Sequence, residues 1–238
     1  MNPGITLSID PSIEAGRLRA ALVWASGLPG SPATTAPSAF LADLLARVRA
    51  SGEAFLKPER KAAVRNMLRH GKYKPAGRAK PSSEYLLAAA LEGDALEGEA
   101  PMGGFPLVNG PVDANNAASL AWGYPASIFD VAKCGRDLLL RWGQPGESYV
   151  FNLSGQVIDL EDLLVACRRG ADGAWEACGN PVKDAMATKV FEDCREVAAV
   201  IYAPVSDSRA DLEACAEAFA GMLRTDCKAA DAGWSIVG

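Results

Sequence analysis

The stretch FPLVNGPVDANNAASLAWGYPASIFD, from Phe105 to Asp130, places small polar side chains among glycines and prolines. Those polar side chains are Asn109, Asp113, Asn115, Asn116 and Ser119. Side chains of this kind hydrogen-bond nearby backbone groups in turns and cap helices. The stretch therefore predicts a polar loop that runs into a short helix over Asn115–Trp122, ended by Gly123 and Pro125. Capping alone would explain the polar residues, and a binding site is the alternative.

Helix-like and strand-like segments follow one another irregularly along the rest of the chain. The expected helices cover residues 38–50, 58–70, 82–92 and 207–223. The expected strands cover residues 5–9, 18–25, 137–142, 148–153, 163–167, 196–202 and 234–237, and an acidic, then Gly/Pro-rich loop is expected over 93–106. Because βα alternation is not regular, we expect an α+β fold with helices packed on a mixed β-sheet. We expect one domain over residues 1–238, with residues 1–50 forming an N-terminal strand and helix portion.

The bulk composition is that of a soluble globular protein, with 49% apolar and 22% charged residues. No apolar run approaches the ~18 residues that indicate a membrane span. The N-terminal sequence MNPGITLSIDPSIEAG lacks the basic and then apolar pattern of a signal peptide. We therefore expect a cytoplasmic protein.

The metal-ligating residue types are scattered. The six cysteines form no CxxC pair, and the single histidine, His70, is far from all of them in the sequence. A zinc site needs such ligands at short spacing, so we expect reduced cysteines and no metal. We interpret His70 as a residue that complements the dipole at the end of its helix rather than as a general base. The common motifs of hydrolases and nucleotide-binding proteins are absent: there is no Walker loop, GxGxxG, HExxH or GxSxG.

Positive charge is concentrated in one segment although the net charge is −5. Nine Lys or Arg residues and a single acid, Glu59, lie between Lys57 and Lys80. Lys61, Arg65 and Arg69 recur at every fourth position, which places them on one face of the expected helix. A basic loop follows, with Lys72, Lys74, Arg78 and Lys80. This cluster favours phosphate contacts, and a solvated helix face is the alternative.

Three motifs appear in order: the opening stretch, YVFNLSG (Tyr149–Gly155) and NPVKDAMATK (Asn180–Lys189). Together they resemble the B3/B4 domain family, the editing module of the bacterial phenylalanyl-tRNA synthetase β subunit, which also occurs as free-standing proteins. The resemblance covers residues 56–204. It implies the α+β fold of that editing domain, ester hydrolysis without metal or organic cofactor, and the acceptor arm of an aminoacyl-tRNA as partner. No membrane and no obligate protein partner are implied.

The resemblance also implies roles for individual residues. Those that would orient the substrate ammonium, the ribose and a water are Asn109, Asp113, Asn116, Asp184 and Thr188. Those that would form the substrate pocket are Ser127, Asn152, Gly155, Met186 and Lys189. Those that would contact tRNA phosphates are Lys61, Arg65, Arg69, Lys72, Lys74, Arg78 and Lys80.

The chain departs from the family pattern at three of these motif positions. Ser127 stands where the synthetase module has a histidine, and Ala185 stands where free-standing members have a serine. Met186 aligns about where the module has an acidic residue that reads a tyrosine hydroxyl. A site without that acceptor is expected to prefer an apolar amino acid, and core packing is the alternative role for Met186.

The leading expectation is a free-standing trans-editing aminoacyl-tRNA deacylase that hydrolyses the ester of mischarged tRNA. An activated ester needs only a positioned water and donors for the developing oxyanion. The rival expectation is a module that binds tRNA or an amino acid without turnover. A weaker third expectation is a hydrolase of some other aminoacyl or peptidyl ester.

Overall fold

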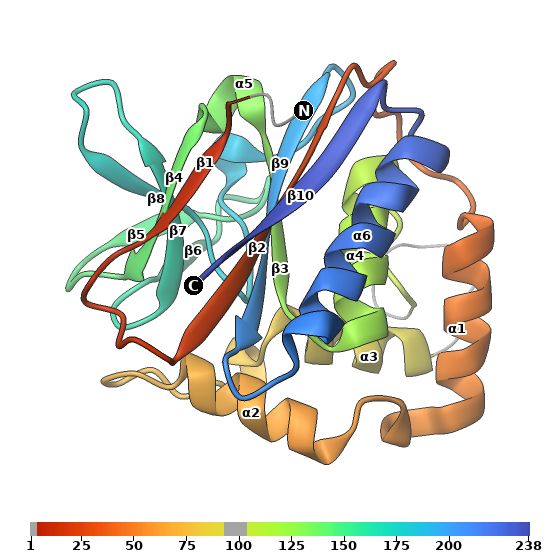
Figure 1. The fold of residues 1–238 in the computed structure, drawn as a ribbon, viewed down its shortest axis with the longest axis horizontal. Helices are drawn as coiled ribbons and strands as arrows, with labels where there is room; N and C mark the ends of the chain where they lie inside the picture. The colour runs from red at the N-terminus through yellow and green to blue at the C-terminus, as the bar shows by residue number, and fades with distance from the viewer. Residues whose placement is uncertain (1–3, 93–103) are drawn as a thin grey trace.

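The computed structural model describes residues 4–92 and 104–238, and its architecture is α+β (Figure 1). Two four-stranded sheets carry the core, and a separate two-stranded hairpin completes the strands of the described chain. Helices pack against the sheets. The expected α+β class with a mixed sheet is confirmed, whereas most of the loop expected over 93–106 lies outside the described residues.

One sheet has the strand order β10-β2-β9-β3, and all its pairs are antiparallel. The strands cover β2 (Leu18–Ser26), β3 (Ala126–Asp130), β9 (Glu196–Pro204) and β10 (Asp231–Val237). The two inner strands, β2 and β9, are almost entirely apolar and buried along their length. Strands buried on both faces have this composition, so β2 and β9 form the centre of the core.

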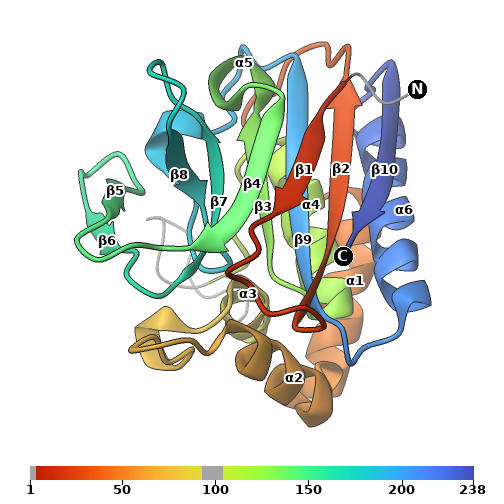
Figure 2. The ribbon, with the colours of Figure 1, turned by 60° about the vertical axis from the view of Figure 1, so that its left-hand side comes forward.

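The second sheet has the order β1-β4-β7-β8 and is mixed, because β1 runs parallel to β4 while the other pairs are antiparallel. Its strands cover β1 (Thr6–Ile9), β4 (Asp137–Trp142), β7 (Leu164–Arg169) and β8 (Trp175–Gly179). Figure 2 shows this sheet beside the first one, with α2 and α3 below.

Several helices begin or end at residues that favour those positions. They cover α1 (Ala39–Ser51), α2 (Pro58–Leu68), α3 (Ser82–Leu91), α4 (Gly110–Trp122), the short α5 (Val131–Cys134) and α6 (Arg209–Thr225). Single 3-10 turns cover η1 (Gly52–Phe55), η2 (Gly77–Ala79) and η3 (Met186–Thr188). The Asn109 side chain accepts a hydrogen bond from the Val112 backbone N–H in the first turn of α4, and Gly123 ends α4 at φ 74°.

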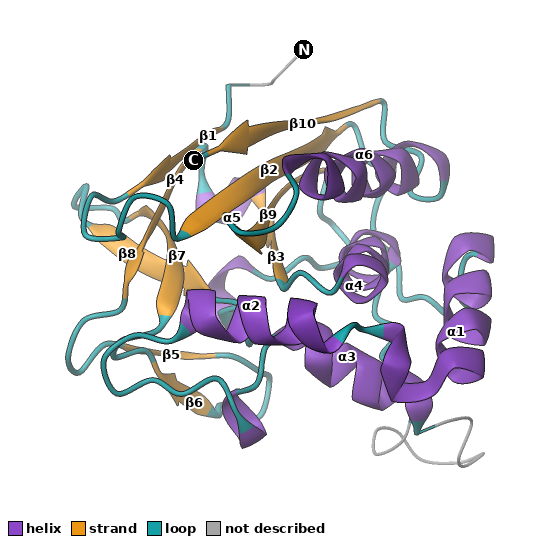
Figure 3. Cartoon of the chain, turned by 60° about the horizontal axis from the view of Figure 1, so that its bottom comes forward, coloured by secondary structure: helices purple, strands orange, loops and turns teal. Residues whose placement is uncertain are grey.

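The hairpin of β5 (Ser148–Val150) and β6 (Val157–Asp159) lies on the opposite side of the molecule from α1 (Figure 3). It hydrogen-bonds to neither large sheet through a strand edge. Tyr149 attaches it instead, since its hydroxyl donates to the Lys183 carbonyl oxygen at 2.6 Å. The turn of this hairpin therefore belongs to a two-stranded sheet that is separate from the two large sheets.

Several expected boundaries were wrong. Helix α4 begins at Gly110 rather than Asn115, because Asn109 is the N-cap and Pro111 fits the first turn. Residues 126–130, for which no strand was expected, form β3 by pairing with β9. Tertiary pairing rather than local pattern creates β3, β6 and β8, so none of them was expected.

We predict that Ile201→Ala, in the centre of β9, lowers the free energy of unfolding by about 2–5 kcal/mol, because it leaves a cavity in a fully buried position. Val157→Ala is the matched control, since that side chain is 60% exposed and its loss should cost under about 0.5 kcal/mol. Urea denaturation measures both. Equal effects would show that β9 is not central to the core.

Candidate functional site

A pocket of about 590 Å³ lies where α4 begins, β3 starts, and the segment 184–192 passes the hairpin turn. Its apolar lining includes Val108, Val112, Ile128, Met186, Val190 and Phe191. Its polar lining includes Ser31, Asn109, Asn152, Asp184 and Lys189. An apolar pocket with few convergent polar groups is the usual form of a small-ligand site.

Asn180 fixes the first part of the segment that lines the pocket. Its side-chain oxygen accepts hydrogen bonds from the backbone N–H groups of Val182 at 2.8 Å and Lys183 at 2.9 Å. Its Nδ2 donates to the Tyr149 hydroxyl at 2.7 Å. An Asn side chain that binds the backbone two residues on makes a turn of defined shape. The chain therefore enters the pocket in a fixed direction before it reaches Asp184.

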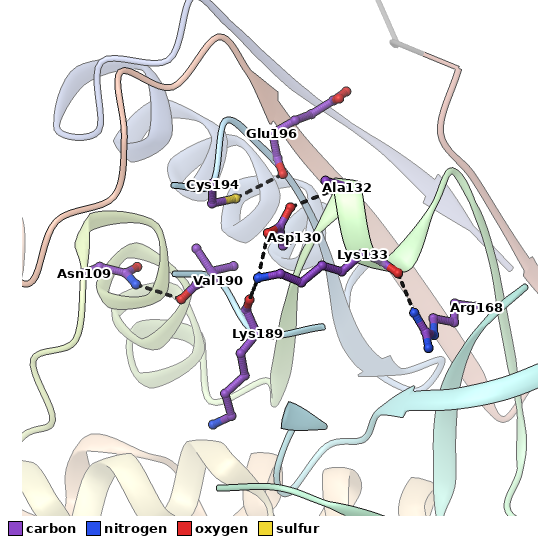
Figure 4. Close-up of polar contacts among 9 residues, drawn as sticks. All are labelled: Asn109, Asp130, Ala132, Lys133, Arg168, Lys189, Val190, Cys194 and Glu196. Carbon is purple, nitrogen blue, oxygen red and sulfur yellow. Dashed lines mark hydrogen bonds and ion pairs between the residues drawn. The ribbon is translucent and has the colours of Figure 1, made fainter. Parts of the chain in front are cut away.

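Two side chains fix the far part of the same segment (Figure 4). The Lys133 ammonium donates to the Lys189 carbonyl oxygen at 2.8 Å and pairs with buried Asp130 at 2.9 Å. The Asn109 Nδ2 donates to the Val190 carbonyl oxygen at 3.0 Å. In Figure 4 the Lys189 side chain extends away from Lys133. The two backbone tethers thus leave the Lys189 ammonium free to face the pocket that it lines.

Asp184 is the most perturbed acid of the pocket. Its Oδ2 accepts a hydrogen bond from the Ile128 backbone N–H at 3.1 Å. Its Oδ1 is buried and has no hydrogen-bond partner among the described residues. Burial raises the pKa of this carboxyl from 3.8 to about 7, and the nearby Ser127 hydroxyl, the Ile128 N–H and the charge of Lys189 only partly oppose that rise. Near neutral pH this carboxyl is therefore present in both protonation states.

Gly179 makes room for the unpartnered carboxylate oxygen. A Cβ atom at this position would lie 2.6 Å from Asp184 Oδ1 and 2.5 Å from a ring carbon of Phe129. No side chain fits there without displacing one of these groups. Glycine at this position therefore leaves the space that Oδ1 and the Phe129 ring occupy.

A buried hydroxyl pair lies beside Asp184. The Tyr202 hydroxyl donates to the Ser127 Oγ at 3.0 Å. The Ser127 hydroxyl in turn donates to the Asn180 carbonyl oxygen at 3.2 Å. Ser127 is fully buried and is not part of the pocket lining. Its contribution is to hold the Asn180 turn and to lower the pKa of Asp184, rather than to meet a ligand directly.

The structure brings two of the five predicted catalytic residues, Asn109 and Asp184, to the pocket lining. Both polar atoms of Asn109 are engaged, one as the cap of α4 and the other on Val190. Thr188 is buried and donates to the Cys178 carbonyl oxygen at 3.0 Å. Asn116 is not among the residues that line the pocket.

Asp113 faces a neighbouring pocket of about 460 Å³ instead. Its Oδ1 accepts from the Val108 backbone N–H at 2.8 Å, which closes the loop before α4. Burial raises the pKa of Asp113, while hydrogen bonds that include Val108 and Thr34 lower it. The structure therefore gives Asp113 a loop-closing contact, separate from the pocket of Asp184.

Three of the five predicted substrate-binding residues line the pocket: Asn152, Met186 and Lys189. The Asn152 amide donates to the Gln156 side chain at 2.8 Å, so it is occupied within the hairpin turn. Gly155 adopts φ 74° in that turn, which favours glycine, and is exposed. Ser127, as described above, lies behind the lining.

Two of the predicted tRNA-binding cations, one on α2 and one in the basic loop, are paired with acids. Arg65 forms a two-pronged ion pair with Glu84, and Lys72 pairs with Glu161 at 2.7 Å. Lys61 donates to the Glu53 carbonyl oxygen at 3.4 Å. Of Lys61, Arg65 and Arg69, Arg65 alone is paired with an acid of the described chain, so a tRNA-binding role for the three stays a prediction. The four other predicted cations, Arg69, Lys74, Arg78 and Lys80, have no ion pair among the described residues.

Some lining residues carried no signal in the sequence. Ser31 lies in a Gly/Pro loop, yet it is 2% exposed, lines the pocket, and its hydroxyl has no partner in the described chain. Leu153 and Phe191 also line the pocket and remain 88% and 42% exposed. The spacing of residues along the sequence does not predict that these residues line a pocket, because they come together only where distant segments of the chain cross.

His70 has a different environment from the one expected. It lies beyond the end of α2 and stacks on Trp142, with ring centroids 4.1 Å apart and planes at 8°. Arg17 also lies against the Trp142 ring, at 5.1 Å. All six cysteines are buried free thiols, and no group of three metal-ligating side chains occurs among residues 4–92 and 104–238.

No protein-family model matches this chain, and no curated protein matches its sequence. The resemblance to the B3/B4 family therefore depends on the quoted motifs alone. Within the described parts of the chain, no helix is long and apolar enough to cross a membrane.

We predict that Asp184→Asn stabilises the protein above neutral pH. The folded pKa is raised from 3.8 to about 7, so ionisation destabilises the folded state increasingly from about pH 4 to pH 7. A shift of this size corresponds to about 4 kcal/mol at pH 8. The variant should lack this pH-dependent loss, and urea denaturation from pH 4 to pH 8 measures it. A variant that follows the same pH dependence as the unmodified protein would contradict the assigned pKa.

Proposed function

We propose that this protein hydrolyses the ester bond of an aminoacyl-tRNA, with the esterified amino acid in the Asp184 pocket. The single observation that carries the proposal is the Asp184 carboxyl, desolvated, with one free oxygen and a pKa near 7. A general base works best when its pKa is close to the working pH. The order of the three motifs supports the choice of substrate class.

The pocket residues have separate tasks in this proposal. The ionised Asp184 carboxylate accepts the proton of a water that attacks the ester carbonyl carbon. Lys189, whose charge acts on Asp184, offers a positive group to the oxyanion that develops. The protonated Asp184 then returns a proton to the leaving ribose oxygen. No metal or organic cofactor takes part in these steps.

The lining favours an apolar amino acid. Val112, Ile128 and Val190 present branched apolar side chains, and Met186 adds an adaptable one. A pocket built this way distinguishes ligands mainly by shape. It discriminates against a ligand that carries an unpaired polar group by a factor of only about 10 to 100 in kcat/KM. We therefore infer a preference for apolar aminoacyl esters over tyrosyl esters.

The rival proposal is a module that binds the same substrate without turnover. It is favoured by Asn109 and Asn152, whose amides are occupied by the protein and so unavailable to a reacting group. Incubation of the purified protein with charged tRNAs separates the two. Release of free amino acid supports the enzyme, and protection of the ester supports the binding module.

We predict that Asp184→Asn reduces the rate of amino acid release at least about 100-fold, because the general base is removed. In the unmodified protein, kcat/KM should rise with pH through about 7 and then level off, because the active form is the carboxylate. A screen of radiolabelled aminoacyl-tRNAs, matched and mismatched, measures both. If Asp113→Asn abolishes release while Asp184→Asn does not, the reaction belongs to the neighbouring pocket and the proposal is wrong.

We predict that Met186→Glu changes the ranking of substrates. A carboxylate among apolar side chains costs several kcal/mol unless it finds a donor, so apolar esters should react more slowly. A tyrosine hydroxyl provides such a donor, so tyrosyl-tRNA should lose less or gain. Met186→Leu is the size-matched control and should keep the original ranking. An unchanged ranking in folded Met186→Glu would assign Met186 to packing only.

A further inference from the structure

Three cations from separate parts of the chain gather near the Asp184 pocket. Desolvation lowers the pKa of Lys183, and the nearby charges of Arg78 and Lys189 lower it further. The Lys183 ammonium lies 3.9 Å from the centroid of the Phe151 ring. None of the three cations forms an ion pair with a carboxylate of the described chain. This group of Arg78, Lys183 and Lys189 therefore lacks the compensation that Arg65 and Lys72 receive.

The cation group borders the pocket on the hairpin side. Lys189 lines the pocket itself. Phe151, beneath Lys183, directly precedes the turn residues Asn152, Leu153 and Ser154, which also line it. Arg78 belongs to η2 in the basic loop. Arg78 is one of the predicted tRNA-binding residues, and its charge acts on Lys183 beside the pocket that would hold the ester.

Like charges held together repel and lower one another's affinity for protons, and a bound anion removes that cost. A phosphate offers several acceptor oxygens to converging ammonium and guanidinium groups. The Phe151 ring adds a surface that holds the Lys183 ammonium in place. The arrangement is therefore suited to one anionic group rather than to a diffuse charged surface.

We propose that Arg78, Lys183 and Lys189 bind a backbone phosphate near the 3′ end of a single-stranded nucleic acid whose terminal ester enters the pocket. This deepens the proposed function and rests on it. A strand with its last nucleotide at the pocket necessarily carries its next phosphate to the pocket border, where the cation group lies. Lys183 acts here as a binding residue and takes no part in the chemistry.

The test compares two substrates that differ in phosphate content. With Lys183→Gln, KM for an aminoacyl-tRNA should rise about tenfold while kcat stays the same. With an aminoacyl-adenosine, which has no phosphate, both constants should stay unchanged. The backbone groups of Lys183 keep their bonds to Asn180 and Tyr149, so the variant is expected to fold.

Arg47→Gln on α1 is the matched control, since it removes one exposed cation on the side of the molecule opposite the hairpin (Figure 3). It should leave both substrates unaffected. The proposal is overturned if Lys183→Gln raises KM equally for both substrates, or for neither. An equal rise in KM with Arg47→Gln would also overturn it, because total charge and not this group would then set the affinity.

A binding measurement keeps the inference testable if the protein turns over no ester. The trinucleotide CCA with a 5′-phosphate and a fluorescent label should bind the unmodified protein, and about tenfold more weakly the Lys183→Gln variant. The salt dependence of binding should fall by about 0.7 in log–log slope, as for one lost phosphate contact on a single strand. Absent binding, equal binding by both proteins, or inorganic phosphate bound as tightly as the trinucleotide would each overturn the nucleic-acid site.

Discussion

The structure of the pocket depends on how the protein satisfies the backbone of residues 180–192, which forms only one turn of 3-10 helix. Backbone groups buried outside regular structure must find partners in other backbone groups, side chains or water. Asn180, Lys133 and Asn109 provide them, at the start and at the end of this segment. Asn109 caps α4 and Lys133 lies in α5, directly after β3. The conformation of residues 180–192 therefore depends on the packing of the first sheet and these helices.

Asp184 acquires its properties from that fixed course. The tethers hold it against Gly179 and the Ile128 N–H, where one oxygen is bonded and the other is not. A free chain would turn this carboxylate toward water, and the packed one does not. The protein thus accepts a destabilising ionisation at one position, which is typical of sites whose chemistry needs a perturbed acid. The charge of Lys189 moderates the cost without removing it.

The sequence was sufficient to predict the fold class. It also predicted the longer elements with a regular pattern of apolar residues, such as α1, α6, β2 and β9. It failed at β3 and β8, because short strands there exist through pairing with distant partners. At the site, Asn109 and Asp184 line one pocket, whereas the roles that the motifs imply for them stay predictions. The partners of Arg65 and the buried hydroxyl of Ser31 could not be anticipated, since both depend on side chains that come from other segments. Charge spacing on a helix says nothing about an acid such as Glu84 on its neighbour.

The central claim is that the partly buried Asp184 carboxyl, whose Oδ1 is out of contact with water, is poised between its two protonation states at neutral pH. Carbon-13 NMR of the aspartate carboxyl carbons, with the Asp184 signal assigned by its absence in Asp184→Asn, measures this directly. The account predicts a titration midpoint at about pH 7 for that signal. A midpoint near 4, the ordinary value for an exposed aspartate, would contradict the account.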